Sequence, residues 1–216
     1  AQAAESVAGR PVPEGLGLQV PVTEVAEFGH WMYNGWLLPI IIAITALVTV
    51  LLAIVVIRYR AGANPEPSKT SHNTLIEVIW TVLPVVILVF IAVPSFKLLY
   101  SQYNPPSVDL TIKVTGHQWY WSYEYPDHDN LAFDAIMLSD EDAAKAELPR
   151  LLATDNRVVV PVGKTVKLLI TSSDVIHSWA IPSFFVKMDA VPGRINETYF
   201  KADKPGIYYG QCSELC

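Results

Sequence analysis

Two long uncharged stretches constrain this chain more than any other feature of its sequence. Residues 31–57 and 78–96 contain no Asp, Glu, Lys, Arg or His. As a helix, the shorter stretch would cover about 28 Å, close to the roughly 30 Å hydrocarbon thickness of a bilayer. Two buried core helices are the alternative, but 51% of the residues are hydrophobic and only 17% are charged. The sequence therefore predicts a membrane protein with spans at about residues 32–58 and 76–100.

The charges between the two stretches predict how the spans are oriented. Arg58, Arg60 and Lys69 lie between them, whereas the flanks offer little besides Lys97. Because cytoplasmic loops are enriched in Lys and Arg, we expect a cytoplasmic link and both termini on the outer side, with a bacterial inner membrane favoured. Residues 1–30 are expected to form an extended outer arm. Their start lacks a basic region followed by an apolar stretch, so no signal peptide is expected in this form of the chain.

The composition changes after the second stretch to short runs that favour β-strands. Asn104-Pro105-Pro106 ends the helical region, and the runs that follow are rich in β-branched and aromatic residues. Strands are expected at residues 108–115, 118–125, 158–160, 165–172, 195–200 and 206–211, with a helical insertion at 139–152. The expected domains are thus an arm at 1–30, a helical hairpin at 31–103 and an all-β domain at 104–216. The last should be a small Greek-key sandwich or barrel on the outer face.

This β domain is acidic. Residues 104–216 contain 15 Asp and Glu against 10 Lys and Arg, which gives a net charge of −5 with neutral histidine. The electric field of an acidic domain speeds its encounter with a basic protein, and this effect weakens as salt is added. A basic protein partner is therefore expected, and no nucleic acid.

The only two cysteines lie close together near the end of the sequence. Cys212 and Cys216 occur in Gly-Gln-Cys-Ser-Glu-Leu-Cys, so their thiolates can converge from one loop, and His177 could add an imidazole. Soft sulfur with imidazole suits copper or zinc. A disulfide in an oxidising outer compartment, or an ordinary zinc site, would use the same residues, and the spacing alone leaves these alternatives open.

Four separated motifs resemble subunit II of the heme-copper oxidases, of the cytochrome c oxidase type. They are Ile-Glu-Val-Ile-Trp at 76–80, Gly-His-Gln-Trp-Tyr-Trp-Ser-Tyr-Glu-Tyr at 116–125, Asp-Val-Ile-His-Ser-Trp at 174–179, and Gly-Gln-Cys-Ser-Glu-Leu-Cys at 210–216. The resemblance covers about residues 30–216. It implies a two-helix transmembrane hairpin followed by a cupredoxin-like Greek-key β-barrel that holds a dinuclear copper centre, CuA.

The resemblance also implies the ligands of that centre. Cys212 and Cys216 would bridge two coppers, and His177 would bind one of them. Glu214 would contribute its carbonyl to copper and its side chain to a magnesium shared with subunit I. In the family Gly-x-x-His-x-x-Met follows, supplying another histidine and a methionine, whereas this sequence stops at Cys216. We therefore expect this sequence to be a shortened form of the domain.

Further roles are implied for residues outside the metal centre. Trp119 would be the exposed point where electrons leave cytochrome c, while Trp121 packs internally. Glu77 would mark the mouth of a proton path into subunit I, although a carboxylate there could equally be an interfacial anchor. Four surface carboxylates would dock cytochrome c: Glu124, Asp134, Asp155 and Asp174. The alternative for each of them is an ordinary solvated charge.

The implied activity is oxidation of ferrocytochrome c with reduction of dioxygen to water, coupled to proton pumping. This subunit would perform only the first electron transfer, with the hemes in subunit I, because two spans cannot enclose them. Its partners would be subunit I, further oxidase subunits, cytochrome c and membrane lipid. One alternative is a quinol oxidase subunit II. Such a subunit would lack the copper site, so this alternative is disfavoured by Cys212, Cys216 and His177. A membrane-anchored copper-binding or copper-delivery protein would leave Trp119 and Glu77 unexplained.

Overall fold

The computed structural model describes residues 8–105 and 107–216 of the chain. The first part of the expected outer arm, residues 1–7, and Pro106 lie outside the described residues, as does the start that was considered for a signal peptide. The chain divides into two compact units. One unit consists of His30–Lys97, and the other joins the residues up to Gly29 with Leu98–Cys216.

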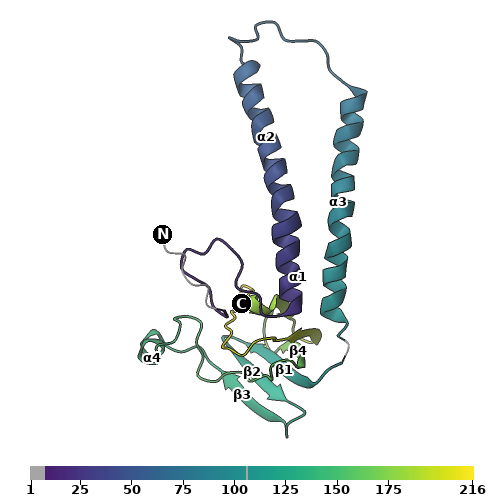
Figure 1. Cartoon of the computed structure of the whole chain (residues 1–216). Helices are drawn as coiled ribbons and strands as arrows, with labels where there is room; N and C mark the ends of the chain where they lie inside the picture. Colours follow the sequence, from purple (N-terminus) through teal and green to yellow (C-terminus); the bar gives the residue numbers. More distant parts are fainter. Residues whose placement is uncertain (1–7, 106) are drawn as a thin grey trace. The chain divides into compact units, whose positions relative to one another are not determined.

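Two long apolar helices dominate the first unit. The chain runs through α1 (Glu24–Met32), a π-helical turn η1 (Tyr33–Leu37) and α2 (Leu38–Arg58), and residues 59–73 then lead to α3 (Thr74–Tyr103), as Figure 1 shows. Both Glu24–Arg58 and Thr74–Tyr103 are long and apolar enough to cross a membrane, and their most apolar windows are not buried against protein. A helix that is apolar on all sides needs an apolar surrounding. Lipid supplies it, and the chain is a membrane protein.

The second unit is built on two β-sheets. The larger sheet has the strand order β3-β2-β1-β4-β7, and the smaller pairs β5 with β6. Within the larger sheet only β1 and β4 run parallel, while the other neighbours are antiparallel. The strands are β1 (Leu110–His117), β2 (Tyr120–Tyr125), β3 (Leu131–Ala135), β4 (Thr165–Ser172), β5 (His177–Ile181), β6 (Val186–Ala190) and β7 (Asn196–Lys201).

Alternating side chains of β1 and β4 form the centre of the core. Ile112 lies opposite Leu168, and Val114 lies opposite Ile170, in the parallel register. All four are almost fully buried. This period of two residues is what a sheet with one covered face requires. Two apolar helices followed by this β unit confirm the expected fold class, a membrane hairpin with a cupredoxin-like domain.

The sequence prediction missed three strands and placed two others wrongly. The missed strands are β3, β5 and β6. Of these, β5 is buried at nearly every position, so its sequence lacks the alternation of apolar and polar residues that marks a half-buried strand. Within the described range 107–216, residues 158–160 and 206–211 belong to no strand. Val159 instead exchanges both of its backbone hydrogen bonds with the Tyr125 hydroxyl, at 2.9 and 3.0 Å. Tyr209 donates its backbone N–H to the Gly9 carbonyl.

Two further segments complete the β unit. The expected insertion contains one short helix, α4 (Asp140–Lys145), capped by the Ser139 hydroxyl. Part of the N-terminal segment belongs to the same core. Val22 is 1% exposed, donates its N–H to the Ser183 carbonyl and accepts one from Asp203. These bonds attach Val22 to the β unit, and the bond from Tyr209 does the same for Gly9.

Candidate metal centre

The three ligands predicted from the sequence converge in the β unit. His177 begins β5, and the two cysteines lie in the irregular segment that follows β7. The Sγ atom of Cys212 is 3.8 Å from that of Cys216 and 3.9 Å from Nδ1 of His177. All three ligand atoms lie within 4.8 Å of one another. Both cysteines are free, and the distance between their sulfurs is far from the roughly 2.05 Å of a disulfide.

These distances fit a soft metal ion. Taking about 2.3 Å for a metal–sulfur bond and about 2.0 Å for a metal–nitrogen bond, one ion would see angles of about 110° between sulfurs and about 130° between Cys212 sulfur and nitrogen. The spacing of the Cys212 sulfur from its two neighbours is therefore compatible with a metal ion, and the thiolate and imidazole donors suit copper or zinc.

Glu214 presents its backbone to the same site. Its carbonyl oxygen lies 3.8 Å from the Sγ atom of Cys212. Its carboxylate is turned to the neighbouring peptide and accepts the N–H of Leu215 at 3.1 Å. The carbonyl is thus placed where it can join the donor set, while the side chain is exposed and open to a further ion.

The His177 ring is held on three sides. Nε2 lies 2.7 Å from Oδ1 of Asp174, and Trp121 meets the ring edge-on with centroids 5.8 Å apart. On the third side Gly116 approaches so closely that an added Cβ would lie 2.8 Å from His177 Cδ2. The ring, which is 2% exposed, can therefore present only Nδ1 to a metal.

Sequence reasoning did not identify Gly116 or this contact of Asp174. The signals existed, because an isolated glycine inside a strand often marks a close approach, and Asp174 precedes His177 by three residues. Neither signal says which group approaches the glycine. Only the pairing of β1 with β4 brings these segments together.

Charges around the site follow from these contacts. The hydrogen bond from His177, together with backbone N–H groups of Val175 and Gln118, holds the pKa of Asp174 well below its usual range. Burial raises the pKa of the Cys216 thiol, and the hydrogen bond with Cys212 raises it further. Asp174 is therefore a firm anion at neutral pH. Binding of a metal ion to Cys216 would displace the proton of this thiol, because a cysteine ligand must be deprotonated.

Trp119 connects the surface to this centre. Its side chain is 75% exposed, yet its Nε1 donates a hydrogen bond to the Cys216 carbonyl at 3.2 Å. The side chain of Gln118 donates to the same oxygen at 2.9 Å. An indole open to a partner protein is thus one hydrogen bond from a candidate ligand residue. Trp121, in contrast, is half-buried and packs against the core.

The other predicted site residues carry local contacts. Glu124 pairs with Lys113 at 3.2 Å, Asp134 accepts the Ser122 hydroxyl at 2.5 Å, and Asp155 accepts the Ile136 N–H at 2.7 Å. These bonds within the domain account for the three carboxylates without a bound cytochrome. The docking of cytochrome c at these residues therefore stays a prediction.

Glu77 lies in the other unit and completes the start of α3. Asn73 caps the helix by accepting the Ile76 N–H at 3.2 Å, and the Glu77 carboxylate accepts the Asn73 N–H at 3.3 Å. Reciprocal bonds of this kind satisfy N–H groups that the first helical turn leaves open. The structure thus shows a capping role for Glu77, and its part in a proton path stays a prediction.

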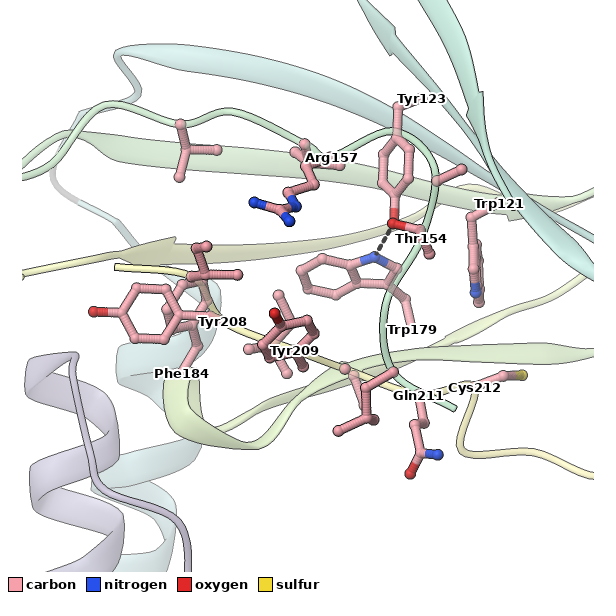
Figure 2. Close-up of a pocket in the computed structure, with 18 of the residues that line it drawn as sticks. Trp121, Tyr123, Thr154, Arg157, Trp179, Phe184, Tyr208, Tyr209, Gln211 and Cys212 are labelled. Carbon is pink, nitrogen blue, oxygen red and sulfur yellow. Dashed lines mark hydrogen bonds between the residues drawn. The ribbon is translucent and has the colours of Figure 1, made fainter. Parts of the chain in front are cut away.

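A cavity of about 620 Å³ lies beside the cysteines, lined mainly by apolar and aromatic side chains. Figure 2 shows its centre, where Trp179 Nε1 donates to the Tyr123 hydroxyl at 3.0 Å. Burial raises the pKa of Tyr123 to about 12. This neutral pair supports the strand that begins with His177.

Comparison with known proteins gives matches over nearly the whole chain. A model of the "Cytochrome C oxidase subunit II, periplasmic domain" matches residues 110–216, and one of the corresponding transmembrane domain matches residues 11–98. A probable cytochrome c oxidase subunit 2 of Rickettsia felis is 55% identical, over 97% of this chain and 66% of its own length. The subunit 2 of Cereibacter sphaeroides is 44% identical, over 97% of this chain and 74% of its own.

A solved structure is also similar in sequence. The periplasmic domain of subunit II of cytochrome oxidase from Bradyrhizobium japonicum is 56% identical and covers 51% of this chain and 76% of that chain, with a TM-score of 0.47. In length, the chain spans slightly less than two thirds of the Rickettsia felis relative described above.

Proposed function

The chain belongs to the cytochrome c oxidase subunit II family, and from this premise we propose that it is the electron-accepting subunit of a cytochrome c oxidase. It would receive electrons from cytochrome c and pass them to a heme-copper centre in subunit I, coupled to oxygen reduction and proton pumping. The observation that carries this proposal is the convergence of the His177, Cys212 and Cys216 ligand atoms within 4.8 Å.

The donor set fits the dinuclear copper centre implied by the family. His177 would bind through Nδ1, both cysteines would bind through their sulfurs, and Glu214 would offer its carbonyl. A bound copper pair would supply a one-electron redox couple. The protein's part is to hold the donors rigidly, because β5 and the surrounding core leave the imidazole no freedom to rotate. A rigid donor set limits rearrangement when the charge changes.

Trp119 would be the point at which electrons arrive. Its exposed indole can meet a partner protein, and its Nε1 hydrogen bond to the Cys216 carbonyl gives a short covalent and hydrogen-bonded route to the sulfur. The net charge of −5 on residues 104–216 favours approach of a basic cytochrome. Glu124, Asp134 and Asp155 would contribute to that field.

The remaining roles concern the complex. The β unit would face the periplasm of a bacterial inner membrane, because Arg60 and Lys69 lie in the link between the spans. Glu214 would share a magnesium ion with subunit I, which would hold the hemes. Glu77 would combine its capping role with a place at the mouth of a proton path.

Copper quantitation with electron paramagnetic resonance tests this proposal in the purified oxidase complex that contains the full-length chain. We expect about two coppers in this subunit and the signal of one unpaired electron shared by both. A single exchangeable copper would instead identify a copper-binding or copper-delivery protein. The proposal would be refuted if the subunit contained no copper. Zinc in place of copper, or quinol as the electron donor, would be such a result.

A further inference from the structure

The carboxylate of Asp174 joins two parts of the site that are far apart in the sequence. Its Oδ1 lies 2.7 Å from Nε2 of His177 and accepts the N–H of Val175 at 2.7 Å. Its Oδ2 accepts the backbone N–H of Gln118, also at 2.7 Å. The Asp174 side chain is only 31% exposed. Both of its oxygens are therefore committed to donors inside the domain.

The bond to His177 decides which ring nitrogen is available. Because the carboxylate accepts from Nε2, the proton is held there, and Nδ1 keeps its lone pair on the side of the Cys212 sulfur, 3.9 Å away. A carboxylate behind an imidazole ligand fixes the tautomer and the ring orientation and raises the basicity of the ligand. Asp174 thus prepares the ring to bind a metal.

The bond to Gln118 places the indole. Gln118 and Trp119 lie between β1 and β2, and both of their side chains donate to the Cys216 carbonyl, at 2.9 and 3.2 Å. Asp174 holds the peptide at the start of this turn. Loss of that bond would free the turn, and with it the contact between Trp119 and the cysteine segment.

We propose that Asp174 is a positioning residue that couples the electron-accepting indole to the metal centre, one oxygen orienting His177 and the other anchoring the Trp119 turn. The inference rests on the proposed function of this site. Glu124 provides the contrast, because its carboxylate is paired with a lysine on the outer face of the sheet and contacts neither part of the centre.

Two variants of Asp174 separate positioning from docking. In Asp174→Asn, one oxygen becomes an NH₂ group that cannot accept, so either His177 or Gln118 loses its acceptor. Asp174→Glu keeps the negative charge but moves the carboxylate by one methylene group. A docking acid would tolerate the glutamate, whereas a positioning residue would not. Glu124→Gln is the matched control, since it removes one charge from the same domain.

The test uses the oxidase complex with the full-length chain and reads the copper centre directly. For both Asp174 variants we expect altered absorption and paramagnetic resonance spectra and a 10- to 100-fold loss of copper affinity, of the order seen when an outer-shell partner of a ligand is removed. In Glu124→Gln the spectra should match the wild type, and only the second-order rate with cytochrome c at low salt should fall.

Two results would overturn the inference. One is wild-type spectra and copper affinity in Asp174→Glu. The other is Asp174→Asn behaving as Glu124→Gln does, with a change confined to the low-salt rate. Failure of the proposed function is distinguishable, because the wild-type complex would then contain no copper, or only a single exchangeable copper, in this subunit, whatever the Asp174 variants do.

Discussion

Replacing Gly116 by alanine should damage the metal centre, although Gly116 offers no ligand atom. The new Cβ would lie 2.8, 2.9 and 3.0 Å from three carbons of His177, whereas carbon atoms in contact rest at about 3.5–4.0 Å. The imidazole would have to move by roughly 0.7 Å. It has little room to do so, because Asp174 and Trp121 hold its other sides.

The cost of such overpacking is about 1–3 kcal/mol. If the ring moves away from the sulfurs to relieve it, copper affinity should fall about 5- to 140-fold, at tenfold for every 1.4 kcal/mol. Competition with a copper chelator measures this affinity in the oxidase complex, and the absorption spectrum reports the change of geometry. Gly17→Ala is the control, since its Cβ would meet nothing within 4 Å. Copper affinity within twofold of the wild type for Gly116→Ala would refute the reasoning.

Two further outcomes follow from the structure and a third from the proposed function. Tyr123→Phe should lower the free energy of unfolding by about 1–3 kcal/mol, because the buried Trp179 N–H loses its acceptor; denaturant unfolding checks this, and unchanged stability would contradict it. Glu197 pairs with Lys167 at 2.7 Å, and the hydrogen bond lowers the pKa of Glu197, so its stabilisation is present at neutral pH and is lost as the pH falls through that lowered pKa. Glu197→Gln should therefore cost up to about 1 kcal/mol at pH 7 and nothing in acid, which unfolding at both pH values tests, and an equal cost at both would count against the pairing. Glu77→Ala should slow steady-state oxygen consumption and leave the copper spectrum unchanged; turnover equal to the wild type would remove Glu77 from the proton path.

The chemistry of the site was easier to predict than its geometry. Cys212, Cys216 and His177 could be identified because thiolate and imidazole are unusual enough to suggest a soft metal, and the structure brings all three together. The spacing could not exclude a disulfide. Only the observed 3.8 Å between the sulfurs, with both thiols free, decides that point.

Asp174 illustrates what the pattern of charges could not tell. An acidic residue in an acidic domain is typical of a solvated or docking group, and that was the expectation. Its hydrogen bond with Gln118 depends on the loop before Trp119 lying beside it, which requires β1 and β4 to pair in parallel across 56 residues. Long-range pairing of this kind leaves no mark on the local sequence.

The amino-acid sequence by itself determined the two membrane helices and the types of donor atoms near the end of the chain. Both depend on local composition, because the transfer of a helix into lipid and the softness of a ligand are properties of the residues themselves. The tertiary structure alone decided which nitrogen of His177 is free, why Gly116 must lack a side chain, and how Trp119 reaches the cysteine segment. These depend on contacts between segments far apart in the chain, and such contacts exist only once the β unit has packed.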